Sequence, residues 1–309
     1  MAHLILGSRG SKLALRQTEY VAAQLKRVCH GLRVDIKTIR TTGDKILDVS
    51  LSRIGDKGLF TKEIEKELLD GSIDMAVHSM KDLPSALGNG LCLGAVLERE
   101  NPGDVLLARE GLSFENLPAG AVIGTSSLRR IAQIRRARPD VKLVDMRGNV
   151  ETRIRKMQEE KLDGIVLAYA GVKRLGFEGL ISDFLPRDIV LPAVGQGAIA
   201  VEAREEDSDK LQLLKMINHD KTFLATRAER SFLRVLEGGC QVPIGCYAEI
   251  RKDHILIEGL VASLDGRQVF RGSKRGSCDQ ASLVGEQLAL ELLQMGAAKV
   301  LADIRNTGE

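Results

Sequence analysis

The stretch HLILGSRGSKLALRQTEYVAAQLKRVCHGLRVDIKTI, residues 3–39, decides the fold class of the chain. Its first six residues form an apolar run that predicts a strand. Residues 11–29 predict a helix, because Leu13, Val21 and Leu25 recur on a roughly shared face. The last eight residues of the stretch predict a second strand. A strand, a helix and a strand in this order indicate a βαβ unit, so we expect a sheet with parallel strands.

The same pattern continues along the first two thirds of the chain. Residues 61–71 predict a helix with Thr61 near its N-cap and Gly71 as its end, and residues 73–79 predict the next strand. After residue 100 a second α/β unit is expected, with strands at residues 121–127, 141–146 and 164–171 and helices at residues 127–138 and 150–161.

The remaining third of the chain changes in kind. Residues 191–204 contain glycines and predict either a hinge or a return crossing. A helix is expected at residues 222–239, then strands with a hairpin turn at Asp265-Gly266, and a closing helix at residues 279–297. The expected fold is two α/β domains facing a cleft plus a small C-terminal α+β domain. The expected domains are residues 1–98 with 200–217, residues 99–199, and residues 218–309.

Composition narrows the class of protein. A chain of 309 residues is too long for one ordinary core. Hydrophobic residues make up 44% and charged residues 28%, with no apolar run long enough to span a bilayer. The 45 basic and 42 acidic residues leave a net charge of only +3, which does not indicate a nucleic-acid partner. The first residues do not resemble a signal peptide, so we expect a cytoplasmic protein without membrane association.

The cysteines do not form a disulfide or zinc pattern. They are odd in number and widely scattered, which favours free thiols: Cys29, Cys92, Cys240, Cys246 and Cys278. Two of them lie in EGGCQVPIGC, residues 237–246, at a spacing that does not suit zinc, so no metal is expected. The predicted helix ends at Gly238-Gly239, and its dipole disfavours a thiolate on the next residue. That thiol is therefore poorly placed as a nucleophile in turnover, but it could carry a bond that is made once.

The segment GTSSLRR, residues 124–130, lies at a predicted turn from strand to helix. Hydroxyls of Thr125 and Ser127, together with unpaired N–H groups at the helix start, suit an anion. Arg129 and Arg130 add two guanidinium groups that can bind carboxylate or phosphate with paired hydrogen bonds. The alternative is that the serines cap the helix and the arginines form its solvated face.

Further arginines follow other predicted strands. Arg9 lies after the first strand, Arg147 lies after a later one, and Arg153 opens a helix. The carboxyl ends of strands in an open α/β sheet form the edge where ligands usually bind, so these side chains could converge in a common cleft. A single arginine is more often at the surface. Their repetition at equivalent places predicts a ligand with several carboxylates or phosphates.

The segment AVHSMKDLP, residues 76–84, leaves a predicted strand for a turn. Lys81 and Asp82 are therefore expected at the same edge of the sheet, where the carboxyl ends of the strands lie. An ionised carboxylate there can stabilise a developing cation and relay a proton. The alternative is that Asp82 caps a turn. His78 is expected to be a satisfied histidine at a strand end. Lys57, between glycines ahead of a helix, is also fit for an anion, although the stretch lacks the spacing of a nucleotide-hydrolysing loop.

These segments together resemble the porphobilinogen deaminase family, also called hydroxymethylbilane synthases. The resemblance covers essentially the whole chain in order and rests on several specific motifs. They are GSRGSKLAL (7–15), TTGDKILD (41–48), GDKGLFTKE (55–63), AVHSMKDLP (76–84), GTSSLRR (124–130), RGNVETRIRK (147–156), LAYAGVKRLG (167–176), AVGQGA (193–198) and LEGGCQVPIG (236–245).

The resemblance implies a transferase of tetrapyrrole and haem biosynthesis. Such an enzyme joins four porphobilinogen molecules head to tail, releases ammonia at each step, and frees hydroxymethylbilane. It also implies two periplasmic-binding-protein-like (type II) domains and a dipyrromethane cofactor joined by a thioether to Cys240. The implied catalytic residue is Asp82. The implied contacts to cofactor and substrate are Lys81, Thr125, Ser127, Arg129 and Arg130 for the cofactor, and Arg9, Ser11, Lys57, Arg147, Arg153, Arg174 and Gln196 for the substrate.

The pyrrole chemistry agrees with the residues found above. Each pyrrole carries an acetate and a propionate, so a growing chain needs many cations in one cleft. Loss of ammonia from porphobilinogen leaves an azafulvene cation, which ionised Asp82 would stabilise. Asp56 stands where many members have glycine or glutamate, and Cys246 is expected to pack. The family implies a monomer without an obligate protein partner. The alternative function is a noncatalytic receptor for an acidic metabolite on the same two-domain fold.

Overall fold

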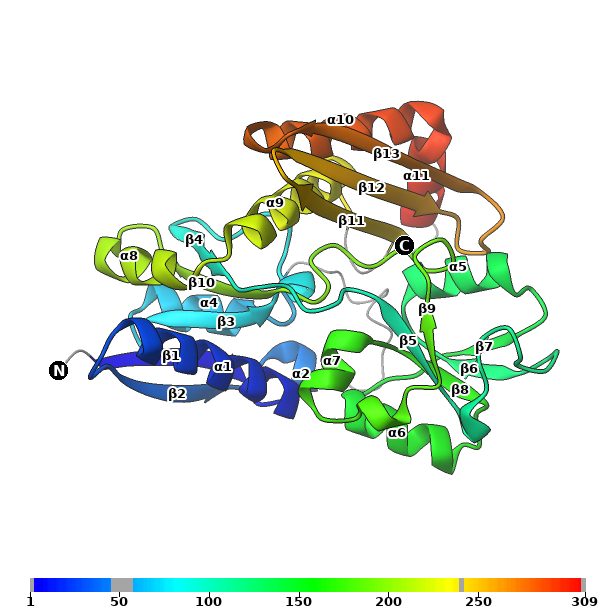
Figure 1. Cartoon of the computed structure of the whole chain (residues 1–309), viewed down its shortest axis with the longest axis horizontal. Coiled ribbons are helices and arrows are strands. Elements are labelled where there is room, and N and C mark those ends of the chain that lie inside the picture. The colour runs from blue at the N-terminus through cyan, green and yellow to red at the C-terminus, as the bar shows by residue number, and fades with distance from the viewer. Residues whose placement is uncertain (1–2, 46–57, 239–241, 307–309) are drawn as a thin grey trace.

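The first domain is built on a five-stranded mixed sheet. A computed structural model describes residues 3–45, 58–238 and 242–306, and in it this sheet has the order β2-β1-β3-β10-β4 (Figure 1). Its strands are β1 (His3–Arg9), β2 (Arg33–Ile39), β3 (Met75–Ser79), β4 (Leu91–Val96) and β10 (Ile199–Arg204). Its helices are α1 (Lys12–Val28), α2 (Thr42–Lys45), α4 (Lys62–Leu69) and α8 (Ser208–Ile217).

The second domain repeats this plan. Its sheet has the order β7-β6-β8-β5-β9. In this sheet β5 runs antiparallel to β8, just as β10 runs antiparallel to β3 in the first sheet. The strands are β5 (Asp104–Ala108), β6 (Val122–Gly124), β7 (Lys142–Val144), β8 (Gly164–Ala168) and β9 (Asp183–Leu185). The helices are α5 (Leu128–Ala137), α6 (Val150–Glu159) and α7 (Tyr169–Arg174).

The C-terminal domain is a three-stranded antiparallel sheet covered by helices. The strands are β11 (Ile244–Arg251), β12 (His254–Ala262) and β13 (Val269–Ser277). The helices are α9 (Asp220–Val235), α10 (Ala281–Leu292) and α11 (Ala298–Asn306). Figure 1 shows α9 on the side of this domain that faces the first domain. The predicted fold class is therefore confirmed, while the predicted domain boundaries stay a prediction.

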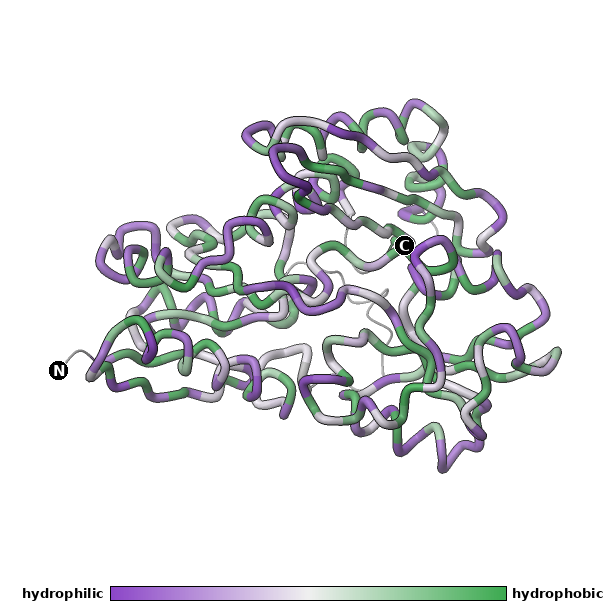
Figure 2. Tube along the Cα trace, in the orientation of Figure 1, coloured by the Kyte–Doolittle hydropathy of each residue, from purple (hydrophilic) through white to green (hydrophobic). Residues whose placement is uncertain are grey.

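Each domain has its own apolar core. Leu6 of β1 is fully buried in the first core together with Val21 and Leu25 of α1. Val21 and Leu25 confirm the predicted helix face, whereas Leu13, predicted on the same face, is only partly buried. Phe232 of α9 is fully buried in the C-terminal core. Hydrophobic and hydrophilic residues alternate along the peripheral helices in Figure 2, as expected for helices with one face on a core. No helix in the described part of the chain is long and apolar enough to cross a membrane.

Three local predictions need correction. The strand expected at residues 164–171 ends at Ala168, because α7 begins at Tyr169 and takes the apolar run into a helix. The strand expected at residues 121–127 covers only Val122–Gly124. Periodicity cannot separate a short apolar strand from the start of a buried helix.

The third correction concerns the end of α9. This helix ends at Val235, earlier than expected, and among the described residues that follow it the left-handed one is Glu237, with φ 47°. Gly238 serves close packing instead, since a Cβ there would lie 2.6 Å from side-chain atoms of Leu233 and Ile244. Gly238 therefore allows α9 and β11 to pack closely.

The segment at residues 191–204 is a return crossing. Its last part is strand β10, which re-enters the first sheet. Gly195 and Gly197 have φ values of 69° and 89°, which favour glycine. Gly195 N–H donates to Glu229 Oε2 at 2.7 Å, and the Arg99 guanidinium pairs with the same carboxylate. This crossing is therefore fixed to α9 by a hydrogen bond to a buried carboxylate that is itself paired with Arg99.

Candidate active site

Asp82 lies in a small pocket at the carboxyl ends of β1 and β3. The pocket has a volume of about 50 Å³, and Arg9, Ser11, Phe60 and Asp82 are among its lining residues. Arg9 Nη1 lies 3.8 Å from Asp82 Oδ2, and the Arg9 guanidinium stacks 4.2 Å from the centre of the Phe60 ring. The carboxylate and the cation therefore share one cavity, as the strand-end argument predicts.

A tight turn presents Lys81 and Asp82. Residues 80–82 form a single 3₁₀ turn after β3, closed by Leu83 N–H donating to Met80 O at 3.2 Å. Met80 and Leu83 are buried, so the two residues between them are directed outwards. Among the described residues, Asp82 donates or accepts no turn-capping hydrogen bond, and the alternative of a capping aspartate is not supported.

Three buried polar side chains line the same pocket. Gln17 Nε2, Thr61 Oγ1 and His78 Nε2 have no hydrogen-bond partner among the described residues. His78 Nε2 lies 3.2 Å from the fully buried Glu202 carboxylate without forming a hydrogen bond, so the expectation of a satisfied histidine at this strand end is not met among the described residues. Sequence reasoning missed Gln17, Phe60 and Thr61. The only signal was that Phe60 and Thr61 belong to the motif GDKGLFTKE.

Lys81 is accessible to water, yet it lies within electrostatic reach of charges in the second domain. Reduced hydration among the surrounding protein atoms lowers the pKa of Lys81 to about 8. The negative charges of Asp82 and Asp104 oppose this shift. The positive charges of Arg130 and Arg129 add to it. Its charge is therefore present at neutral pH and is lost as the pH rises through about 8.

This titration gives a first prediction. The KM for a substrate that carries carboxylates is expected to rise above pH 8 in the unmodified protein, because Lys81, next to Asp82, loses a charge that attracts carboxylates. Lys81→Gln should raise KM about tenfold at pH 7 and abolish that rise, whereas Lys81→Arg should move it to higher pH. Initial rates between pH 6.5 and 9.5 measure this. A rise above pH 8 that persists in Lys81→Gln would contradict the assignment.

The start of α5 is open to an anion. Ser127 is its N-cap residue but makes no side-chain capping bond. Ser126 instead joins two loops, since its hydroxyl donates to Met146 O at 2.7 Å and accepts from Met146 N–H at 3.0 Å. Thr125 is buried, and its hydroxyl accepts from Ser127 N–H at 3.3 Å. The alternative of simple capping serines is therefore wrong for this helix.

Arg129 and Arg130 are buried and share one carboxylate. Arg129 Nη1 lies 2.7 Å from Asp104 Oδ2, and Arg130 Nη2 lies 2.6 Å from Asp104 Oδ1. Gln196 Nε2 donates to the same Oδ1 at 2.9 Å. Burial would raise the pKa of Asp104, but the two guanidinium groups outweigh it and hold the pKa far below its ordinary value. The alternative of a solvated face is wrong, and two charges on one carboxylate leave a net positive centre.

Two more arginines lie at the start of α6. Burial, together with the positive charges of Arg130 and Arg147, lowers the pKa of Arg153 to about 10. The negative charges of Asp145 and Asp82 oppose this shift. Arg147 Nε is buried without a hydrogen-bond partner among the described residues, 3.7 Å from Asp145 Oδ2. Crowded like charges indicate a site shaped for an anion that compensates them.

Other predicted contacts serve the fold directly. Ser11 caps α1 by accepting from Ala14 N–H at 3.2 Å, and it also lines the Asp82 pocket. Arg174 donates to Gly197 O at 2.6 Å and so ties α7 to the return crossing. Lys57 and Cys240 lie outside the described residues, as does Asp56. Cys246 is buried in the C-terminal core, which confirms it as a packing cysteine.

The two halves of the site are held together. Lys12, next to the cap of α1, pairs with Glu151 of α6 at 2.6 Å. The charge of Asp82 in the first domain acts on Arg153 in the second. In the described ranges, no group of three or more histidine, cysteine or acidic side chains could hold a metal ion.

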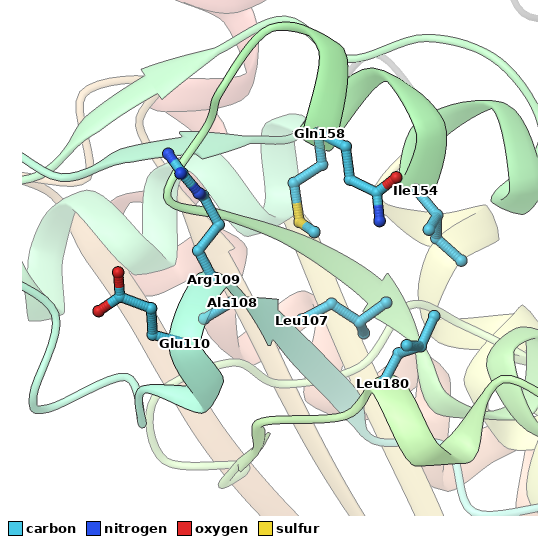
Figure 3. A pocket seen from close by; sticks show the side chains of 8 residues that line it. Leu107, Ala108, Arg109, Glu110, Ile154, Gln158 and Leu180 are labelled. Atoms are coloured by element: carbon cyan, nitrogen blue, oxygen red, sulfur yellow. The ribbon is translucent and has the colours of Figure 1, made fainter.

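A second hollow lies away from these residues. It has a volume of about 320 Å³ and is lined mainly by apolar side chains of the second domain, including Leu107, Ile154 and Leu180 (Figure 3). None of the predicted site residues lines it. The candidate site residues Arg9, Ser11 and Asp82 line the smaller pocket instead.

These features define an α/β protein with a cationic site, contributed by two domains, around one exposed carboxylate. Two family models match the chain: "Porphobilinogen deaminase, dipyromethane cofactor binding domain" over residues 4–212, and "Porphobilinogen deaminase, C-terminal domain" over residues 223–294. The porphobilinogen deaminase of Syntrophomonas wolfei subsp. wolfei is 62% identical over 99% of this chain and 100% of its own. That of Carboxydothermus hydrogenoformans is 56% identical over 98% and 97%. The chain belongs to the porphobilinogen deaminase family.

Solved structures with a related arrangement are more distant. A BvgS VFT2 domain of Bordetella pertussis matches 70% of this chain and 85% of its own, with a TM-score of 0.42 and 16% identity. A TRAP periplasmic solute binding protein from Desulfovibrio salexigens matches 70% and 71%, with a TM-score of 0.41 and 12% identity.

Proposed function

We propose that this protein is a hydroxymethylbilane synthase that joins four porphobilinogen molecules head to tail with release of ammonia. One observation carries the proposal: Asp82 pairs with Arg9 in the first domain, and its charge also acts on Arg153 of the second domain. The chain that shows this arrangement belongs to the porphobilinogen deaminase family. A substrate with two carboxylates per pyrrole needs this excess of guanidinium groups. The transfer reaction needs a carboxylate near the reacting ring, and Asp82, 3.8 Å from Arg9, is the proposed one.

The residues present fit a dipyrromethane cofactor, the group named by the matching family model. Such a group carries four carboxylates. The second domain offers three cationic features for them: the start of α5, the net charge of the Arg129–Arg130–Asp104 cluster, and Arg147, whose Nε makes no hydrogen bond among the described residues. When bound, it supplies the pyrrole carbon to which the first substrate is joined. Thr125, Ser127, Arg129 and Arg130, with Lys81 opposite them, are the proposed holders.

Asp82 and the residues around it have separate roles in this proposal. Asp82 accepts hydrogen bonds from pyrrole N–H groups and stabilises the positive charge that develops as ammonia leaves porphobilinogen. Arg9 and Ser11 bind substrate carboxylates, and Arg9 is kept in place by the Phe60 ring. Lys57, Arg147, Arg153, Arg174 and Gln196 complete the proposed binding set. Arg174 and Gln196 act mainly by fixing the return crossing.

Cys240 is the proposed thioether attachment point, and mass measurement tests it. The purified chain is expected to be heavier than its sequence mass by one dipyrromethane, and Cys240→Ser should abolish this addition because no other thiol replaces it. Cys278→Ser is the matched control, since Cys278 is a free and partly exposed thiol in the C-terminal domain. An adduct that survives Cys240→Ser would overturn the attachment site.

Ammonia release separates this proposal from a noncatalytic receptor for an acidic metabolite. A receptor would bind porphobilinogen without releasing ammonia, whereas the proposed enzyme releases one ammonia for each substrate consumed. A cytoplasmic monomer is the proposed state of the chain.

A further inference from the structure

A guanidinium group from the C-terminal domain holds the turn that carries Asp82. Arg230 of α9 donates through Nη2 to Pro84 O at 2.8 Å and to Ser85 O at 3.2 Å. Its Nη1 lies 4.0 Å from Met80 Sδ. Arg230 therefore contacts the chain on both sides of Asp82.

The other side of this turn is already fixed. Met80 N–H donates to Ala198 O at 3.0 Å, and a Cβ on Gly195 would lie 2.3 Å from Met80 Cγ. Met80 and Leu83 share a buried apolar cluster with residues of β4 and β10. The return crossing thus holds the start of the turn, while Arg230 holds the chain that leaves it.

The chemistry of Arg230 suits this role. Burial lowers its pKa, with the charge of Glu202 opposing and that of Arg234 adding to the shift. Both of its described hydrogen bonds to oxygen come from Nη2 and go to two consecutive carbonyl groups, while Nη1 contacts Met80 Sδ. A lysine ammonium has one nitrogen, so it cannot donate to these carbonyl groups and also provide the second nitrogen that contacts Met80 Sδ.

We propose that Arg230 is a positioning residue, which sets Asp82 relative to α9, the helix that runs into the loop with Cys240. This inference rests on the proposed function, because it assumes that Asp82 acts on a pyrrole held from that loop. Displacement of a reacting group by about 1 Å can lower a rate about a hundredfold, so a contact of this kind affects kcat.

The test compares Arg230→Lys and Arg230→Gln with Arg234→Gln. Arg234 lies one turn further along α9, is half exposed and pairs with Glu286 at 2.7 Å, so it controls for loss of charge on the helix. Arg230→Lys is expected to lower kcat about tenfold at unchanged KM, and Arg230→Gln to lower it more. Amide hydrogen exchange at Leu83, whose N–H closes the turn, should become faster in both Arg230 variants and stay unchanged in Arg234→Gln.

A double-mutant comparison shows whether Arg230 acts through Asp82. In an Asp82→Asn background, Arg230→Lys should lower kcat by less than about twofold, because the group it positions has lost its charge. Full additivity, or unchanged exchange at Leu83, would overturn the inference. If Asp82→Asn alone keeps normal turnover, the proposed catalytic role fails, while the exchange measurement still reports on the contact itself.

Discussion

Asp82→Asn is expected to lower kcat for ammonia release by about 100- to 1,000-fold, the effect of removing one preorganised electrostatic group from an active site. Asparagine keeps the size of the side chain and one carbonyl oxygen, but it removes the negative charge that faces the developing cation. Arg9, 3.8 Å away, would keep its positive charge beside the reacting pyrrole. The KM should change much less, because the cations that bind the carboxylates are untouched.

The measurement is steady-state ammonia release, together with the melting temperature and the intact mass. Asp82 is partly exposed and makes no capping bond among the described residues, so the variant should fold normally. Asp140→Asn is the control: Asp140 pairs with Arg138 at 2.7 Å on the surface of the second domain, and its loss should leave kcat unchanged. Near-normal turnover by Asp82→Asn would exclude this carboxylate as the electrostatic catalyst.

Much of the fold could be predicted because it depends on local patterns. The strand–helix–strand order of residues 3–39 corresponds to β1, α1 and β2 with small differences at the ends. Parallel strands also bring their carboxyl ends to one edge, which is why Arg9 and Asp82 could be expected to meet. In both cases the signal lies within a few residues of the feature.

The partners of buried charges could not be predicted in this way. Asp104 binds Arg129 and Arg130 from 25 and 26 residues away, across the second sheet. The pair of Arg99 with Glu229 spans 130 residues and joins a crossing to α9. Such pairings depend on how domains pack, and no spacing in the sequence encodes them. For this reason the sequence allowed two interpretations of Arg129 and Arg130, ligand-binding or solvated. Neither interpretation included their pairing with Asp104.

The second large effect is expected at Asp104 and concerns stability. Asp104→Asn should lower the free energy of unfolding by about 3–5 kcal/mol, the usual result of removing one partner from a buried ionic cluster. Asp104 is fully buried, and it accepts from both guanidinium groups and from Gln196 Nε2. Burial already lowers the pKa of Arg129, and without Asp104 both arginines would remain charged with no compensating carboxylate.

Urea unfolding of the enzyme as purified measures this loss, and its pH dependence identifies the cause. The two guanidinium groups hold the pKa of Asp104 far below its ordinary value, so its contribution is complete above about pH 4 and is lost only as the pH falls further. The difference between Asp104→Asn and the unmodified chain should therefore be constant from pH 5 to pH 8 and shrink below about pH 4. If the difference instead shrank between pH 8 and pH 6, a group other than Asp104 would be titrating. A loss no larger than that of the surface control Asp140→Asn would mean that the cluster does not stabilise the second domain.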